Sequence, residues 1–290
     1  MAVLRSFLVK DPRKPIVAVI TSGTLPVPAL LGGGIQTVVY DYAVCNQMQN
    51  IIIVSALDGG MPPYELDKNG IGHIRIRNKA FDNFELVWKG HFLVRYSRYI
   101  YKACERLLEL RPDIVHIHNM PHFVPIVREK LGPDVKIILT DHNTKIAEEN
   151  YVLRQLPKIM SSLDKVIYPS KRIAEIDLTN NYPHFKEKVS VIYNGVDTAL
   201  YKKYPEKDMA RVRAKYGIKT PKTIIFVGRL VAEKGAAVLL SALPQVLQAN
   251  PDTSLVVVGS SFFGKGQDTP YVKKLRELAE PIKDKVIFTG

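Results

Sequence analysis

Short apolar runs alternate along most of the chain with stretches whose apolar residues recur at helical spacing. The run 16–20 is bounded by Thr-Ser-Gly, which predicts a short buried strand, and apolar residues then repeat at helical spacing through 35–43. Strands that alternate with helices are typical of parallel sheets with helices on both faces. The sequence therefore predicts an α/β fold. The expected strands are 16–20, 51–54, 114–117, 135–139, 165–168, 189–192, 223–227, 254–258 and 285–288.

The clearest helix prediction covers residues 92–110. Leu93, Tyr96, Ile100, Ala103, Leu107 and Leu110 form one apolar stripe along it, and Pro112 ends it. The segment 58–84 is weakly patterned and reads as a loop, with a strand only at 73–76. Further helices are expected at 144–156, 208–216, 234–249 and 271–278.

The character of the chain changes after Asn194-Gly195, where a polar connector begins. We predict one domain over residues 1–196 and a second over 197–290. The apolar runs 224–227 and 255–258 predict strands that are buried on both faces. The second domain then shows about three strands and ends on one, which would leave apolar surface uncovered. We therefore expect this domain to be incomplete.

Composition narrows the class of protein. The content of 46% hydrophobic and 24% charged residues is typical of a globular protein. The charges between Arg5 and Lys14 argue against a signal peptide, and no apolar run is long enough for a membrane span. Cys45 and Cys104 are too few for a disulfide framework, which favours the cytoplasm, and we expect both thiols to be buried.

The formal net charge of +13 favours anionic partners: nucleic acid, an anionic membrane or phosphorylated substrates. Basic residues are spread over segments such as 75–79, 89–106 and 202–215 without a nucleic-acid-binding signature, so we expect no nucleic-acid partner. We predict instead that a basic face of the first domain contacts an anionic membrane.

Ligands of open parallel sheets bind beyond the carboxyl ends of the strands, so the residues that follow each strand are the candidates. Gly33 and Gly34 precede a predicted helix, where a bare backbone and a helix N-terminus suit an anion, although a flexible turn fits equally well. His118 ends one strand, and His142 and Asn143 follow the next. His118 could bond a hydroxyl group or a developing charge, whereas a purely structural histidine is the alternative.

The strongest candidate is the segment 228–235. A strand ends in Gly228, Arg229 follows, and Lys234 lies at the predicted start of the next helix. Two cations beside a helix N-terminus make a diphosphate site that needs no metal. Glu233 is expected to stabilise the first turn of that helix. Asn194 fits a hinge and a ligand contact equally well.

Signatures of several other chemistries are missing from the sequence. It contains no Asp-x-Asp pair, no Cys/His cluster with zinc-binding spacing, no Walker loop and no Gly-x-Ser-x-Gly elbow. We therefore expect no metal and no organic cofactor.

Four motifs, in this order along the chain, resemble glycosyltransferase family 4. They are Gly-Gly-Gly-Ile-Gln at 32–36, Asp-Ile-Val-His-Ile-His-Asn at 113–119, Tyr-Asn-Gly-Val-Asp at 193–197 and Phe-Val-Gly-Arg-Leu-Val-Ala-Glu-Lys-Gly at 226–235. The resemblance covers nearly everything after Ile16, and the last motif is the most specific. It implies the GT-B architecture, in which two Rossmann-like domains face a cleft. Segments 25–28, 259–264 and 286–288 are similar to the spore coat protein SA branch of that family.

The resemblance also implies a reaction. It is a metal-independent transfer of a hexose, with retention, from a UDP- or GDP-linked sugar to a glycan or lipid-linked acceptor in the cell surface or spore envelope. The family's paired glutamates would lie beyond Gly290. Catalytic roles fall on His118, Arg229 and Lys234, donor binding on Gly33, Gly34, Asn194, Gly228, Arg229 and Lys234, and the acceptor or sugar side on His142 and Asn143.

Two other functions remain open on the sequence. One is a non-catalytic coat or assembly protein that kept the fold, and the other is a nucleotide-sugar epimerase. Arg229 and Lys234 favour an enzyme over a scaffold, because a scaffold needs no diphosphate site. The expected location is the cytoplasm, with a peripheral membrane position or the spore coat as alternatives.

Overall fold

The computed structural model describes residues 2–46, 48–58, 60–78, 83–88, 91–143, 154–176, 183–261 and 269–290. The chain divides into two compact units, Met1–Gly195 and Val196–Gly290. The predicted domain boundary, after residue 196, lies next to this division.

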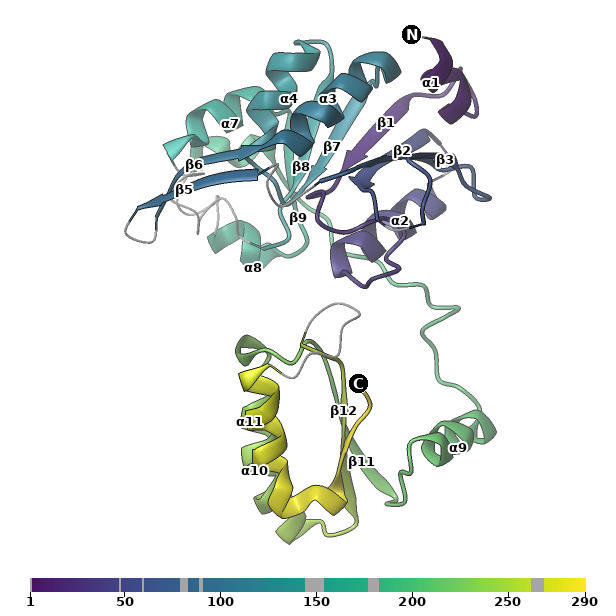
Figure 1. The fold of residues 1–290 in the computed structure, drawn as a ribbon, viewed down its shortest axis with the longest axis vertical. Coiled ribbons are helices and arrows are strands. Elements are labelled where there is room, and N and C mark those ends of the chain that lie inside the picture. The colour runs from purple at the N-terminus through teal and green to yellow at the C-terminus, as the bar shows by residue number, and fades with distance from the viewer. Residues whose placement is uncertain are drawn as a thin grey trace. The chain divides into compact units, whose positions relative to one another are not determined.

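The first unit is built on a sheet with the strand order β10-β9-β8-β7-β1-β2-β4-β3 (Figure 1). Neighbouring strands pair in parallel, except that β3 runs antiparallel to β4. The prediction missed β3, because its few residues carry no clear alternation. The strands are β1 (Ile16–Ile20), β2 (Asn50–Ala56), β3 (Tyr64–Leu66), β4 (Gly72–Ile76), β7 (Ile114–His118), β8 (Lys136–Thr140), β9 (Lys165–Tyr168) and β10 (Val189–Val191).

Helices cover both faces of this sheet, with α3, α4 and α7 on one face and α2 on the other (Figure 1). Alternate side chains of β1 pack into the cores on the two faces of the sheet. Ala18 and Ile20 share a core with residues of α3, whereas Val17 and Val19 share one with Val39 of α2. The helices of this unit are α1 (Ala2–Leu8), α2 (Gly34–Cys45), α3 (Arg98–Leu110), α4 (Phe123–Leu131), α7 (Leu156–Ser162), α8 (Lys171–Ala174) and the 3-10 helix η3 (Pro183–Lys188).

The predicted helix over 92–110 is wrong in its first part. Residues His91–Ser97 form strand β6, which pairs antiparallel with β5 (Asn83–Trp88), and only Arg98–Leu110 is helical. Apolar residues at 92, 94 and 96 also satisfy a period of two, and β-branched and aromatic residues suit a strand. Pairing with β5 therefore decided between the two periods.

Two further expectations need comment. Cys104 is buried, and burial raises the pKa of its thiol to about 12, but Cys45 is exposed, so the prediction of two buried thiols is wrong for Cys45. Ala43 points into the core from α2, and a position two residues further on is turned by about 200°. Most of the predicted helix 144–156 lies outside the described residues, and α7 begins at Leu156.

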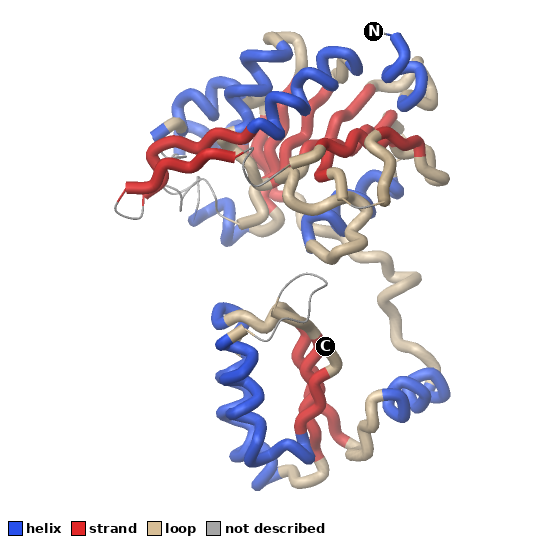
Figure 2. Tube along the Cα trace, in the orientation of Figure 1, coloured by secondary structure: helices blue, strands red, loops and turns tan. Residues whose placement is uncertain are grey.

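The second unit has a parallel sheet in the order β11-β12-β13. Helices α10 and α11 lie on one face of it (Figure 2). Leu240, Leu243 and Leu275 of these helices share a hydrophobic core with Leu255 and Val257 of β12. The elements are α9 (Glu206–Lys215), β11 (Lys222–Val227), η4 (Ala232–Lys234), α10 (Ala236–Ala249), β12 (Thr253–Val258), α11 (Pro270–Ala279), η5 (Glu280–Lys285) and β13 (Val286–Phe288).

The prediction that the strand at 224–227 is buried on both faces is wrong. Ile225 and Val227 are 63% and 71% exposed. Ile224 and Phe226, which alternate with them, pack against the core. Helix α9 buries none of its residues, so in the described part of the second unit it gives these side chains no cover.

No helix in the described part of the chain combines the length and the apolar character that crossing a membrane requires.

Candidate functional site

The glycine turn lies at the N-terminus of α2. Gly33 is the N-cap with φ 118°, a backbone conformation that residues with a side chain rarely adopt, so this position favours glycine. A Cβ atom on Gly34 would meet nothing within 4 Å. Within the described part of the chain no side chain caps this helix end, so its first backbone N–H groups suit an anion.

A buried arginine braces the segment that leads into the glycine turn. Arg75 of β4 donates to the backbone oxygen of Val27 at 3.3 and 3.4 Å and to that of Pro62 at 3.0 Å. Its guanidinium also pairs with the Glu65 carboxylate at 2.8 Å. A buried charge is tolerated only with such partners. Arg75 therefore fixes the backbone before Gly33 to the rim of the sheet.

Three histidines meet at the carboxyl ends of β7 and β8. His116 and His118 lie on the same side of β7, as alternation predicts, with ring centroids 4.4 Å apart. His118 Nδ1 lies 3.0 Å from His142 Nε2, and His116 Nε2 lies 2.7 Å from the Thr140 hydroxyl. The parallel register places His118 opposite Thr140, which brings His142 to the same edge.

Asn119 positions His142, and the sequence analysis missed it. The Asn119 side-chain oxygen accepts the backbone N–H of His142 at 2.6 Å. Asn119 has φ 59°, a left-handed conformation that Asn tolerates better than most residues. On the other side, the backbone N–H of Asn143 donates to the Asp141 carboxylate at 3.2 Å. A polar residue directly after a buried strand was the available signal for both Asn119 and Asp141.

Burial keeps the histidine cluster neutral. It lowers the pKa of His116 to about 4, with the charge of His142 as the second cause. Burial also lowers the pKa of His118 well below its usual value, helped by the charges of His116 and His142, and it lowers the pKa of His142. His118 thus offers a neutral imidazole. Its buried Nε2 has no hydrogen-bond partner among the described residues.

In the second unit, the candidate turn follows β11. The backbone N–H of Gly228 donates to the Val258 oxygen at 3.0 Å and that of Leu230 to the Ser260 oxygen at 3.0 Å, so the turn stays tied to β12. Gly259 has φ 135°, and a Cβ atom there would lie 2.0 Å from the Gly228 oxygen. The two strands can approach this closely only with glycine at 259, which the sequence analysis did not place in the site.

Lys234 does not start the helix, contrary to the prediction. It ends the 3-10 turn η4, and Gly235 then adopts the left-handed conformation with φ 74° before α10 begins at Ala236. That glycine interrupts the helical path, so Lys234 lies just ahead of the helix. The N-cap Gly235 has no side chain to cap α10, and the Tyr271 hydroxyl accepts the backbone N–H of Ala237 in its first turn at 3.3 Å. Arg229 pairs with Glu233 at 3.1 Å, with the two side chains 46% and 67% exposed.

The remaining candidate, Asn194, lies in the exposed segment after β10, outside any helix or strand. Among the residues with described positions, no group of three or more His, Cys, Asp or Glu side chains is arranged to hold a metal ion.

We predict that the neutral histidine cluster makes stability depend on pH. His116 titrates at 6.5 when unfolded and at about 4 when folded, so the unfolded chain binds more protons between these values. His116 therefore contributes about 3 kcal/mol to the free energy of unfolding at a pH above its unfolded pKa. This contribution is lost as the pH falls toward the pKa of the folded state. Urea unfolding over this range checks it.

His116→Gln keeps a hydrogen-bond partner for the Thr140 hydroxyl but removes the titrating imidazole. The free energy of unfolding of this variant should therefore depend less on pH. His184→Gln, which replaces an exposed histidine, is the matched control. An unchanged slope in His116→Gln would contradict the assignment.

Comparison with protein families gives two matches. Residues 32–200, more than half of the chain, match Glycosyltransferase Family 4. Residues 208–290 match Glycosyl transferases group 1. Together they include the glycine turn, the histidine cluster and the turn after β11.

Individual relatives agree with these matches. The Bacillus subtilis (strain 168) spore coat protein SA is 30% identical over 279 residues, which cover 94% of this chain and 68% of the relative. The YtcC protein of the same strain is 28% identical over 277 residues, which cover 94% of this chain. The chain spans 63% of the length of YtcC, which is less than two thirds.

Solved structures share the fold. Anabaena HepE in complex with UDP and glucose has a TM-score of 0.68 at 22% identity, over 96% of this chain and 69% of that one. A glycosyltransferase from Rickettsia africae has a TM-score of 0.69 at 20% identity, over 96% and 68%. These likenesses confirm the predicted α/β fold of GT-B type. With the match over residues 32–200, they lead to the conclusion that the chain belongs to glycosyltransferase family 4.

Proposed function

We propose that this chain carries the donor-binding part of a nucleotide-sugar-dependent glycosyltransferase. It moves a hexose, with retention and without a metal, from a UDP- or GDP-linked sugar to a glycan or lipid-linked acceptor. The acceptor belongs to the cell surface or the spore envelope. The similarity to spore coat protein SA supports the spore envelope, and the complex of HepE with UDP and glucose supports a UDP-linked donor.

The observation that carries the proposal is the turn between β11 and α10. It places Arg229 and Lys234 within a few residues of the N-terminus of α10, where the Tyr271 hydroxyl binds one of the first backbone N–H groups. Backbone N–H groups and the helix dipole favour a phosphate at this place, and charge-assisted hydrogen bonds to the cations add to the attraction. Gly228 and Gly259 keep the rim of the sheet free of side chains. Such a turn can stabilise the nucleoside diphosphate that leaves in the reaction.

The histidine cluster supplies a different kind of group. Because burial lowers the pKa of His118, its imidazole is neutral near pH 7 and acts through hydrogen bonds. We propose that its Nε2 bonds a hydroxyl of the transferred sugar, while the bond to His142 fixes the ring. His142 and Asn143 lie toward the acceptor or the sugar in this proposal, and the glycine turn at Gly33 and Gly34 contributes to donor binding.

The combination of two cations and a helix N-terminus favours an enzyme over a coat protein that only kept the fold. We also propose a cytoplasmic location with peripheral contact to an anionic membrane, which the net charge of +13 supports. Cosedimentation of the protein with anionic vesicles tests this contact. If as much protein sediments with neutral vesicles as with anionic ones, the membrane proposal is wrong.

We predict that Arg229→Ala and Lys234→Ala each weaken the binding of UDP or GDP by about tenfold or more. Each removes a charge-assisted hydrogen bond, which contributes roughly 1.5–3 kcal/mol. Isothermal titration calorimetry of the natural protein and of each variant measures the change in affinity for the nucleotide. Glu233→Gln is the matched control, because it releases Arg229 from its acidic partner, and its affinity should stay the same or rise. Unchanged affinity in both alanine variants would remove the diphosphate site.

We predict that the natural protein releases a nucleoside diphosphate from a nucleotide sugar, and that an acceptor glycan or lipid extract accelerates this release. A panel of UDP- and GDP-linked hexoses, read out by the freed nucleotide, tests it. The anomeric configuration of the product, determined by NMR, tests retention. Conversion of the nucleotide sugar into an isomer without acceptor would instead establish an epimerase.

A further inference from the structure

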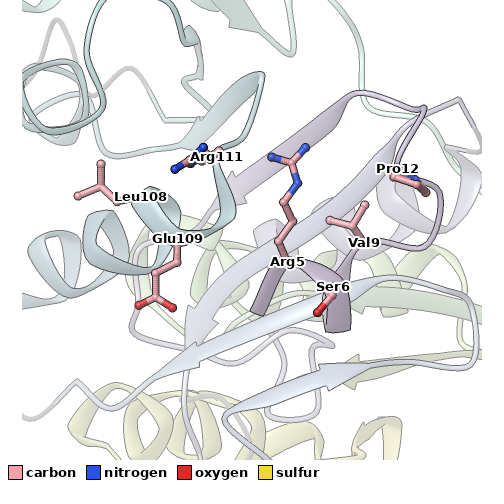
Figure 3. Close-up of a pocket in the computed structure, with 7 residues that line it drawn as sticks. All are labelled: Arg5, Ser6, Val9, Pro12, Leu108, Glu109 and Arg111. Atoms are coloured by element: carbon pink, nitrogen blue, oxygen red, sulfur yellow. The ribbon is translucent and has the colours of Figure 1, made fainter. Parts of the chain in front are cut away.

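A cavity of about 650 Å³ opens between α1 and the end of α3 in the first unit (Figure 3). Helix α1 ends at Leu8, ahead of β1, and helix α3 ends at Leu110, ahead of β7. The cavity therefore lies at the amino ends of the strands, whereas the histidine cluster lies at their carboxyl ends. The two features face opposite edges of one sheet.

Two guanidinium groups line this cavity, from Arg5 of α1 and Arg111 after α3. Within the described part of the chain neither side chain has a hydrogen-bond or ion-pair partner. The acidic residue of the lining, Glu109, is paired with Arg106 at 2.8 Å. Figure 3 shows the Arg5 side chain extending to the level of Arg111, while the Glu109 carboxylate points the other way. The cavity thus presents uncompensated positive charge.

The rest of the wall is largely apolar. Val9 and Pro12 come from the segment after α1, and Leu108, which is 52% exposed, comes from α3. Apolar walls strengthen the attraction between the guanidinium groups and an anion, because they displace water. The volume falls within the range of small-molecule sites in proteins.

We propose that this cavity binds the phosphoryl group of a phosphate ester, at a site separate from the nucleotide-sugar site. A guanidinium presents paired N–H donors whose geometry matches two phosphate oxygens, so two arginines can hold one phosphoryl group. The apolar wall then accommodates the carbon skeleton of the ester. Free phosphate esters and the glycerophosphate part of a phospholipid share this chemistry.

Helix stability explains the two arginines only in part. A cation at the carboxyl end of a helix is stabilising by itself, and Arg111 caps α3 with φ 55° and a backbone N–H bond to the Leu107 oxygen at 2.8 Å. This stabilisation of the helix end does not depend on the cavity, so it leaves the cavity unexplained. Arg111→Asn removes the guanidinium but suits the left-handed backbone, so it separates binding from stability.

The test titrates the natural protein with glycerol 3-phosphate by calorimetry, and in parallel sediments it with phosphatidylglycerol or phosphatidylcholine vesicles. Arg5→Gln and Arg111→Asn should each weaken binding about tenfold, and the double variant more. Arg13→Gln is the charge-matched control. Arg13 lies in the next segment with its side chain 88% exposed, pairs with Asp11 and does not line the cavity. Its substitution should leave binding within about twofold.

Each outcome has a fixed meaning. Saturable binding of glycerol 3-phosphate supports the site with a free ester as ligand, and binding to phosphatidylglycerol vesicles alone supports it with a lipid phosphate. Binding to neither probe overturns the proposal, as does an equal loss in Arg13→Gln or no loss in the double variant. Thermal unfolding checks that the variants fold. If Arg5→Gln does not fold, Arg111→Asn alone tests the proposal. UDP affinity should be unchanged in these variants, which keeps this test distinct from that of the diphosphate site.

Discussion

Parallel pairing of β7 with β8 is the constraint on which the candidate site of the first unit depends. The register sets His118 opposite Thr140, so the residues that leave both strands emerge at one edge. His142 then reaches His118, and Asn119 holds the backbone of His142 in place. Burial of this edge removes the charge from the imidazoles. The same pairing that forms the core therefore sets both the position and the protonation state of His118.

The second unit repeats this logic with other groups. Pairing of β11 with β12 brings Gly228 and Gly259 together where their strands end, and the missing side chains leave the backbone bare. Arg229 and Lys234 then supply charge just ahead of the N-terminus of α10. In the proposed function, one unit offers neutral hydrogen-bonding groups for a sugar, and the other offers cations and N–H groups for a diphosphate. This division of chemistry matches what a transfer from a nucleotide sugar requires.

The cavity at the opposite edge of the first sheet adds a second region of positive charge. Its arginines come from segments that end far from the histidine cluster, and its walls are apolar. A phosphate ester held there would leave the carboxyl edge free for the sugar. The proposed ester site would give part of the net charge of +13 a local role besides the proposed donor site.

Local patterns in the sequence determined most strands, the helix over 98–110 and the polar residues at strand ends, because period and turn chemistry are properties of neighbouring residues. The sequence could not decide between strand and helix for 91–97, since the residues satisfy both periods and only pairing with β5 separates them. It also could not reveal the exposure of Ile225 and Cys45, which depends on what packs over them. The roles of Asn119 and Gly259 follow from contacts between separate strands. Distances of that kind are set by tertiary structure alone.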